Sequence, residues 1–358
     1  MKKRLLIFCF YDKTGIVDAW DIELLRQLKY VSNRIIFVVN GYINEESRSR
    51  ISNYTDEIII RENRGLDYGA YQYVILNYLK NNELKIYDEL ILCNNSFIGF
   101  FNPINDIFEA MEDKPFDLWG LNEVKRGIID MIQSYLLVVK KKIIQSDVLV
   151  DYFQRNRLKG SNYGQVVAYL ESKLYTYLKN KGYSLGSYTY TESYDIYANP
   201  DICITQYFLP IIKKKCFLSH YCDKDKIEKA VNSVKECELV ENKMFPPYIK
   251  ESNDMVGRRR IAKALIDENL MLSWADKDYF YIFGNGNIAH ELYYTYFENN
   301  KLFKGFIESK KISDDEMVYT IEEVPNNSRV IVGVRQEIQN EIIELLPKSM
   351  TILKLWDV

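Results

Sequence analysis

The stretch RLLIFCFYDKTGIVDAWDIELLRQLKYVSNRIIFVVNG, residues 4–41, decides the fold class. It contains two apolar runs of strand length, 4–10 and 34–40, and the segment between them, DAWDIELLRQLKYV, has apolar residues at helical spacing. Each apolar run is continuous rather than alternating, which is typical of strands buried on both faces of a parallel sheet. The stretch therefore predicts a strand–helix–strand unit of an α/β protein.

The same alternation continues along the chain. DEIIIREN (56–63) and DELILCNNSFIGF (88–100) are further runs of strand length, separated by the helical pattern of LDYGAYQYVILNYLKNN. FDLWGLNE (116–123) and SYLLVVKK (134–141) add two more strands. A long amphipathic helix, NYGQVVAYLESKLYTYLKNKG, is expected to end at Gly182, because glycine readily takes the left-handed conformation that closes a helix.

The length of 358 residues exceeds what one core of typical size uses, so two domains are expected. Residues 1–222 are predicted to form a Rossmann-type α/β domain, and the charged, helical segment 223–272 is predicted to be a bridge. Residues 273–358 begin with strand, Gly-rich turn and helix in DYFYIFGNGNIAHELYYTYFENN. Three later apolar runs would complete a small four-stranded Rossmann-like domain.

Composition and charge exclude some classes of protein. A net charge of −3 gives no general attraction to nucleic acid. MKKRLLIFCFYD has too short an apolar run for a signal peptide, and no run approaches the roughly 18 residues of a membrane helix, so the cytoplasm is the expected location. Cys216, His220, Cys222 and Cys237 could be drawn together as a zinc site, but they lack the C-x-x-C pair that such sites use.

Ligands of open parallel sheets bind beyond the carboxyl ends of the strands. Polar residues follow five of the predicted strands, which would bring them to one edge. They are Tyr11-Asp12, Asn40-Gly41, the stretch Asn63 to Tyr71, Asn94-Asn95-Ser96 and Asn122-Glu123.

The segment RENRGLDYGAYQYV (61–74) crowds turn-forming residues and one acid beside aromatic residues. Gly65 and Gly69 would let the main chain approach a flat or phosphorylated group. Asp67 could accept hydrogen bonds from a ribose or a base. The alternative for Asp67 is a helix N-cap, which needs no ligand.

Two other features could carry chemistry. Mg²⁺ and Mn²⁺ prefer carboxylate ligands, and the loop at Asn94 and Asn95 supplies none. A metal ion bound there would therefore be coordinated by phosphate, by water or by an Asp elsewhere in the chain. Glu171 lies in the helical pattern VVAYLESKLYTYL and would be a general base if it faces the cleft. Alternatively, Glu171 is an exposed helical acid near Lys173.

The motif GNGNIA (284–289) follows an apolar run and opens a helix, which is the context of a phosphate-binding turn. Gly284 and Gly286, with Glu308 at the end of the next strand, form a candidate second nucleotide site. Such glycines also serve tight packing alone, and His290 is expected to be structural. An NAD-linked oxidoreductase using this turn would need a redox site, which the sequence does not suggest.

The ordered series of motifs resembles the rhamnan synthesis protein F family of bacterial polysaccharide glycosyltransferases over residues 3–220. The resemblance is carried by FYDKTGIVD, RIIFVVNG, DEIIIRENRGLDYGAY, YDELILCNNSFIGFF, FDLWGLNE, IQSYLLVVKKK, the Glu171 helix with NKGYSLG, and NP…LPIIKKK. It implies a GT-A-like fold for the first domain. It also implies transfer of a sugar, often L-rhamnose from a dTDP-sugar, onto a lipid-linked precursor of a cell-surface polysaccharide.

The resemblance assigns candidate residues by position. Asn95 departs from the family, which usually has Asp there, and Met131 stands where a His is common. Glu171 matches the helical acid and becomes the candidate catalytic base of an inverting transfer. The other matches would bind the donor: Tyr11, Asp12, Asn63, Gly65, Asp67, Gly69, Tyr71, Asn94, Ser96, Gln133, Ser134 and Lys213, joined by Asn40 from the strand-end argument.

Roles and partners follow from these matches. Asp12 and Asp67 would address the nucleoside, and Lys213 would offset the diphosphate charge. Expected partners are a nucleotide-sugar donor and a glycan or lipid-linked acceptor, with Mn²⁺ or Mg²⁺ as candidate cofactors. Association with the inner face of the membrane and a homodimer are further expectations. The alternative function is a nucleotide-sugar or glycan-binding scaffold that has lost catalysis, marked by Asn95.

Overall fold

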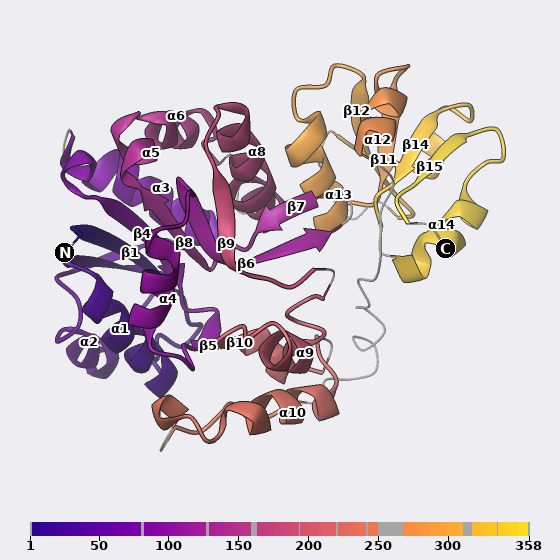
Figure 1. Ribbon diagram of the computed structural model, residues 1–358. Helices are drawn as coiled ribbons and strands as arrows, with labels where there is room; N and C mark the ends of the chain where they lie inside the picture. Colours follow the sequence, from indigo (N-terminus) through magenta and orange to yellow (C-terminus); the bar gives the residue numbers. More distant parts are fainter. Residues whose placement is uncertain are drawn as a thin grey trace. The chain divides into compact units, whose positions relative to one another are not determined.

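The computed structural model describes residues 2–79, 82–126, 129–158, 163–192, 194–219, 221–240, 243–249, 268–310, 317–334 and 336–356 (Figure 1). The chain forms two compact units. The first consists of Met1–Val124, Met131–Ser161 and Leu174–Arg258, and the second of Lys125–Asp130, Asn162–Lys173 and Arg259–Val358. The boundaries of these units differ from the predicted domain boundaries. Residues 162–173 group with the second unit, and residues 223–258 group with the first.

The main sheet begins with four parallel strands, as the apolar runs predict, and the structure places them in the order β3-β2-β1-β4. Beyond β4 the sheet becomes mixed, since β8 pairs antiparallel with both β4 and β6. The parallel sheet predicted from the first four strands is therefore confirmed for those strands, and the two later predicted strands make the sheet mixed. β7 follows β6 in the sheet, and β9 pairs parallel with β6.

The strands of this sheet and of the small β5–β10 pair are β1 (Arg4–Phe10), β2 (Arg34–Asn40), β3 (Glu57–Arg61), β4 (Glu89–Asn94), β5 (Phe97–Gly99), β6 (Leu118–Arg126), β7 (Ile129–Ile132), β8 (Leu136–Lys140), β9 (Leu185–Tyr190) and β10 (Ile211–Lys213). The helices are α1 (Ala19–Val31), α2 (Glu45–Ile51), α3 (Leu66–Tyr73), α4 (Ile104–Glu112), α5 (Lys141–Gln145), α6 (Val148–Arg155), α8 (Lys173–Asn180), α9 (Pro200–Thr205) and α10 (Lys224–Val234).

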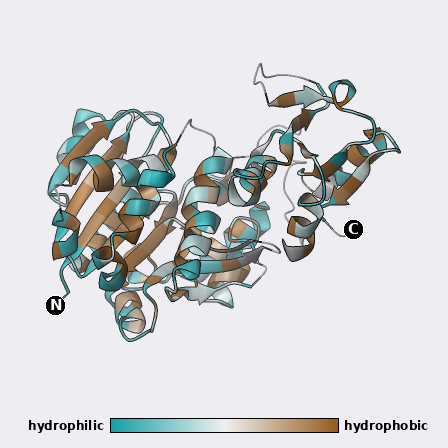
Figure 2. Cartoon of the chain, turned by 90° about the horizontal axis from the view of Figure 1, so that it is seen from above, coloured by the Kyte–Doolittle hydropathy of each residue, from teal (hydrophilic) through white to brown (hydrophobic). Residues whose placement is uncertain are grey.

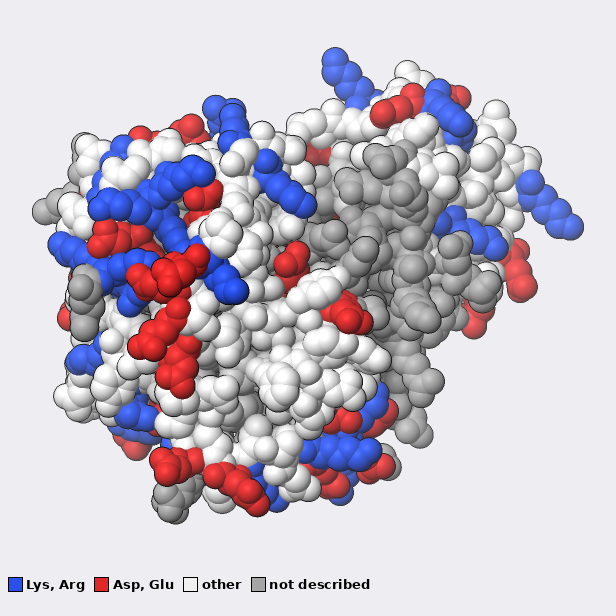
Figure 3. Space-filling model, in the orientation of Figure 1, with Lys and Arg blue, Asp and Glu red and all other residues white. Residues whose placement is uncertain are grey.

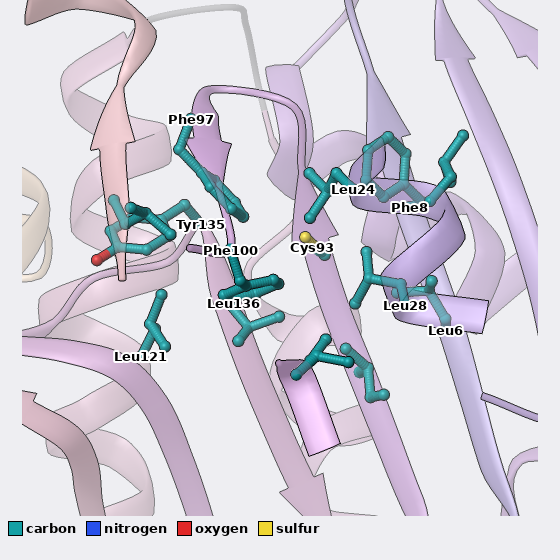
Figure 4. Close-up of a cluster of buried hydrophobic side chains, with 14 of the residues drawn as sticks. Leu6, Phe8, Leu24, Leu28, Cys93, Phe97, Phe100, Leu121, Tyr135 and Leu136 are labelled. Atoms are coloured by element: carbon teal, nitrogen blue, oxygen red, sulfur yellow. The ribbon is translucent and has the colours of Figure 1, made fainter. Parts of the chain in front are cut away.

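The core of the first unit lies between the sheet and helices such as α1. Phe8 on β1 is fully buried and stacks on Phe37 of β2 at 5.3 Å between ring centroids. Leu24 and Leu28 of α1 belong to the same buried cluster, which Figure 4 shows beside Phe8. The strands of the sheet are the most apolar segments of the chain in Figure 2. Burial of this apolar surface stabilises the layer that holds the polar strand ends in place.

A capping box begins α1 and includes a buried acid. Asp18 is the N-cap and accepts from the Asp21 amide, while the Asp21 carboxylate accepts from the Asp18 amide. Asp21 is 2% exposed and also accepts from Lys214 Nζ at 2.7 Å. Burial raises the pKa of Asp21 to about 6, although Lys214 opposes the shift. Ionised Asp21 therefore costs the folded state free energy.

This shift predicts a specific pH dependence of stability. The folded pKa lies above the ordinary 3.8, so the contribution of neutral Asp21 is fully present below pH 3.8 and is lost as pH rises through about 6. Asp21→Asn removes this titration. We expect the free energy of unfolding of D21N, relative to wild type, to rise by about 2–3 kcal/mol from about pH 4 to about pH 7. Urea titrations at several pH values measure it, and a pH-independent difference would contradict it.

The second unit contains a separate sheet in the order β13-β12-β11-β14-β15, parallel throughout. It has five strands where four were predicted, because the short strand β13 adds to one edge. The predicted long helix ending at Gly182 is divided into α7, a π-helical turn and α8. The elements are α7 (Tyr163–Val167), the π turn (Ala168–Ser172), α12 (Glu268–Ala275), β11 (Phe280–Phe283), α13 (Asn287–Leu292), β12 (Phe303–Glu308), β13 (Val318–Thr320), β14 (Arg329–Val332), α14 (Gln336–Leu345) and β15 (Thr351–Lys354).

Charged side chains of both signs are interspersed on the face of the molecule that Figure 3 shows. The basic run GRRR (257–260) lies outside the described residues, as does His220.

Candidate functional site

Four parallel strands, β3, β2, β1 and β4, end at one edge of the first unit's sheet, since neighbouring parallel strands run in the same direction. Tyr11, Asn40, Asn63 and Asn94 end or follow these strands, so the structure brings them to this edge as predicted. The pair Asn122-Glu123 differs, because it lies inside β6 and not after it.

A continuous chain of hydrogen bonds joins four of the candidate side chains at this edge. The Lys213 ammonium donates to Ser96 Oγ at 2.5 Å, and the Ser96 hydroxyl donates to Asn94 Oδ1 at 2.5 Å. Asn94 Nδ2 then donates to Asp67 Oδ2 at 2.7 Å. All three bonds run in the same direction, from a cation to a carboxylate, so each one polarises the next. The predicted positive and negative groups of the site belong to one network.

Asp67 is the acid of this network. It occupies the second position of α3, and Gly65 is the N-cap, so the N-cap alternative for Asp67 is wrong. Its Oδ1 accepts from the Tyr68 amide at 3.0 Å, in the first turn, where the helix dipole favours an anion. Burial raises the pKa of Asp67, and the hydrogen bonds from Asn94 and Tyr68 with the charge of Lys213 oppose that rise.

The two glycines of RENRGLDYGAYQYV are required by the packing of the turn itself. Gly65 has a φ of +78°, and a Cβ there would lie 1.9 Å from Leu158 Cδ1. A Cβ on Gly69 would lie 2.2 Å from the Arg64 carbonyl oxygen. The Gly69 amide donates to the Gly65 carbonyl at 2.7 Å, which closes the turn. The structure therefore supplies a reason for both glycines that does not involve a ligand.

Arg61 is a contributor that the sequence analysis missed. Its guanidinium donates to Asn40 Oδ1 at 2.5 Å and to the Arg64 carbonyl at 2.7 Å. Asn40 is 1% exposed, and its Nδ2 donates to the Leu66 carbonyl at 2.8 Å. Arg61 and Asn40 therefore fix the turn that carries Asp67. The sequence signal for this role is an Arg at the end of a strand, directly before the turn.

Tyr71 lies beneath the site and not on its surface. Its side chain is fully buried, and its hydroxyl has no hydrogen-bond partner among the residues that the structure describes. Burial raises the pKa of Tyr71 well above its ordinary value, and Asp67 and the thiols of Cys9 and Cys93 act in the same direction. Tyr71 therefore supports the turn from the inside in this conformation.

The end of β1 is fixed by the loop after β4. Asn95 Oδ1 accepts from the Tyr11 amide at 3.2 Å, and Asn95 Nδ2 donates to the Tyr11 carbonyl at 3.3 Å. The Tyr11 ring is 51% exposed. Asp12 Oδ1 accepts from the amides of Thr14 and Ile16 and from the Thr14 hydroxyl. Burial raises the pKa of Asp12, but these hydrogen bonds outweigh burial and the net shift is downward.

A second group of polar side chains lies along β6. Gln133 and Ser134 are in the turn between β7 and β8, and the Gln133 amide donates to the Asn122 carbonyl at 2.8 Å. Asn122 and Thr191 are both fully buried. The side-chain amide of Asn122, Gln133 Nε2 and the Thr191 hydroxyl have no partner within the described ranges. Buried polar atoms without a protein partner are usually hydrogen-bonded by water or by a ligand.

Glu171 lies in the π-helical turn Ala168–Ser172, which groups with the second unit. It therefore belongs to a different compact unit from Asp67, and its predicted role as a base stays a prediction. The neighbouring side chains contact their own unit: the Tyr169 hydroxyl donates to Glu298 Oε1 at 2.5 Å, and Lys173 forms an ion pair with the same Glu298.

The donor set of the loop at Asn94 does not fit a divalent cation. The loop contributes two amides and a hydroxyl, whereas Mg²⁺ and Mn²⁺ favour carboxylates, and Lys213 already contacts Ser96. Among the described residues, no three His, Cys, Asp or Glu side chains gather into a metal-binding group. Cys216, Cys222 and Cys237 are free thiols.

The candidate second nucleotide site lies in the second unit. Gly284 follows β11 with a φ of +108°, and a Cβ there would lie 3.0 Å from the Gly333 carbonyl oxygen, so close packing accounts for it. Gly286 is the N-cap of α13, and Glu308 ends β12 as predicted. His290 packs on Phe306 with ring centroids 4.5 Å apart. Nucleotide binding here stays a prediction.

A family model described as Rhamnan synthesis protein F matches residues 35–249, which is more than half of the chain. The chain belongs to the rhamnan synthesis protein F family. This confirms the resemblance inferred from the motifs. The matched range contains the whole hydrogen-bonded network from Asp67 to Lys213.

Two curated relatives align with this rhamnan synthesis F chain over only part of their own length. Virulence protein VirA of Vibrio anguillarum is 29% identical over 188 residues, covering 51% of this chain and 58% of the relative. Uncharacterized protein y4gN of Sinorhizobium fredii is 24% identical over 192 residues, covering 51% of this chain and 48% of the relative. The chain therefore spans about half the length of these relatives.

Solved structures match this chain with low sequence identity and low TM-scores. Glucosyl-3-phosphoglycerate synthase of Mycobacterium tuberculosis, solved with Mn²⁺, UDP and phosphoglyceric acid, is 8% identical with a TM-score of 0.33, covering 52% of this chain and 68% of that one. A proposed nucleotide-diphospho-sugar transferase of Desulfovibrio desulfuricans is 11% identical with a TM-score of 0.33, covering 57% and 87%. The sheet topology of the chain itself confirms the predicted α/β class.

None of the helices in the described part of the chain is both long enough and apolar enough to cross a membrane.

Proposed function

We propose that the chain is a glycosyltransferase that moves a sugar from a nucleoside diphosphate onto a glycan or lipid-linked glycan acceptor. The observation that carries the proposal is the network from Lys213 through Ser96 and Asn94 to Asp67. A carboxylate that can accept from a nucleoside and an ammonium that can face a diphosphate lie at the same sheet edge. Membership of the rhamnan synthesis F family supports L-rhamnose from a dTDP-sugar as the transferred group.

The network suggests how the donor would lie. Asp67 would accept hydrogen bonds from the base or ribose, with Asp12 on the same side, and Lys213 would face the diphosphate. In the transfer step, the bond from the sugar C1 to the diphosphate oxygen breaks, and its electron pair leaves with that oxygen. The acceptor oxygen forms the new bond to C1, and its proton passes to Glu171. Direct attack of this kind inverts the anomeric carbon.

The acceptor would be a growing cell-surface polysaccharide on its lipid carrier, and the chain would then work at the inner face of the membrane, alone or as a homodimer. The alternative is a nucleotide-sugar or glycan-binding scaffold. Asn95 favours this alternative, since it replaces a family acid and is engaged with the Tyr11 backbone. Donor hydrolysis and transfer, assayed with and without Mn²⁺, separate the two: a scaffold binds the donor and turns over none of it.

Asp67→Asn tests the donor site. We expect the affinity for the best nucleotide sugar in a thermal-shift panel to fall about tenfold to a hundredfold, because a charged acceptor is lost. The fold should persist, because burial already disfavours the ionised form of Asp67. Glu62→Gln, which changes an exposed acid of the same segment, is the matched control and should bind as wild type does. Equal binding by D67N and wild type would remove Asp67 from the site.

A further inference from the structure

In the loop that would carry a metal in the donor site, the side-chain oxygens of Asn94, Asn95 and Ser96 already accept hydrogen bonds from other groups of the protein. Asn94 Oδ1 accepts from both the Ser96 amide at 3.1 Å and the Ser96 hydroxyl at 2.5 Å. Asn95 Oδ1 accepts from the Tyr11 amide, and Ser96 Oγ accepts from Lys213. Each oxygen of Asn94, Asn95 and Ser96 is therefore directed into the protein, where it stabilises the loop.

The Lys213 ammonium lies where a metal ion would be expected to neutralise the diphosphate. It is 3% exposed, and its ammonium lies 4.2 Å from the centre of the Tyr135 ring and 5.7 Å from that of Tyr197. Aromatic faces attract a cation, so these rings help to retain the charge away from water. The next residue, Lys214, donates its amide to the Ser96 carbonyl at 3.0 Å, which ties this segment to the loop.

A divalent cation and this ammonium would compete for the same place. A cation bound to Ser96 or Asn94 would lie within a few ångströms of Lys213, and like charges at that distance repel strongly in a poorly solvated site. The nearest acid of the network, Asp67, already accepts from Asn94 at 2.7 Å. The network thus already holds a fixed positive charge, that of Lys213, beside Ser96.

We propose that this chain binds its nucleoside-diphosphate donor without a divalent cation and that Lys213 supplies the positive charge at the diphosphate. The proposal rests on the proposed function. It distinguishes this chain from the mycobacterial synthase of similar fold, which was solved with Mn²⁺. The same charge would stabilise the leaving diphosphate as the bond to the sugar breaks.

The test is calorimetric titration of the full chain with dTDP and with UDP, in EDTA and in MnCl₂. For wild type we expect equal affinity in both solutions. Lys213→Met should lose about tenfold to a hundredfold in affinity in both, because a charged hydrogen-bond donor is removed. Lys213→Arg, which keeps the charge, should retain binding in EDTA. Lys215→Met changes the charge equally at a site that contacts the Tyr221 ring, and it should bind as wild type does.

Three outcomes would overturn the proposal. Wild-type binding that is lost in EDTA and restored by Mn²⁺ defeats the inference and leaves the proposed function intact. Undiminished binding by a folded K213M protein also defeats it. Failure of wild type to bind either nucleotide in both solutions defeats the proposed function itself, and the inference with it. If K213M does not fold, the wild-type and K213R titrations in EDTA still decide the question.

Discussion

Replacing Glu171 with Gln should abolish glycosyl transfer and leave donor binding nearly intact. The amide has the shape of the acid but cannot take the acceptor proton, so the rate should fall by about a hundredfold to ten-thousandfold. Glu171 lies in the π-helical turn Ala168–Ser172, and π turns inside helices are frequent at functional sites. The turn groups with the second unit, whereas Asp67 groups with the first.

The two measurements must be made on the same preparation. Transfer is followed with the nucleotide sugar that stabilises the protein most and a glycan acceptor, and donor affinity is measured by calorimetry. Glu228→Gln is the control, since Glu228 forms an exposed ion pair with Lys224 that contributes little to stability. A parallel loss of transfer and donor binding in E171Q would assign Glu171 a role in binding. Unchanged transfer would exclude it as the base.

Replacing Gly69 with Ala should be among the most destabilising single changes in the first unit. The added Cβ would lie 2.2 Å from the Arg64 carbonyl oxygen and 3.1 Å from an Arg61 guanidinium nitrogen. The first of these atoms is backbone in a tight turn and cannot rotate away, so the turn itself must move. We expect a loss of about 3 kcal/mol in the free energy of unfolding.

The control for this change is Gly182→Ala. Gly182 has a φ of +82° with nothing within 4 Å of the Cβ position, so only backbone strain is added there. That strain should cost about 1 kcal/mol. Urea denaturation of both variants measures the difference, and nucleotide binding by any folded G69A protein reports on the turn. Equal stabilities for the two variants would show that the turn tolerates a side chain at position 69.

The sequence by itself determined the first half of the main sheet and the polar residues that end its parallel strands. Continuous apolar runs at 4–10 and 34–40 signal buried parallel strands, because burial on both faces removes the alternation that an exposed face requires. Parallel strands end at one edge, so the polar strand ends could be placed together before the structure was known. The motif series also predicted the family correctly.

Only the tertiary structure decided which of these residues contact one another. Lys213 and Ser96 are 117 positions apart, and they meet because β10 pairs with β5; a local pattern of hydrophobicity contains no information about such pairing. The antiparallel direction of β8 is likewise not predicted by its apolar run, because the hydrophobic pattern of a strand is the same in either direction. The sequence thus indicated the candidate residues. Long-range packing brought Lys213 and Asp67 into one hydrogen-bonded network.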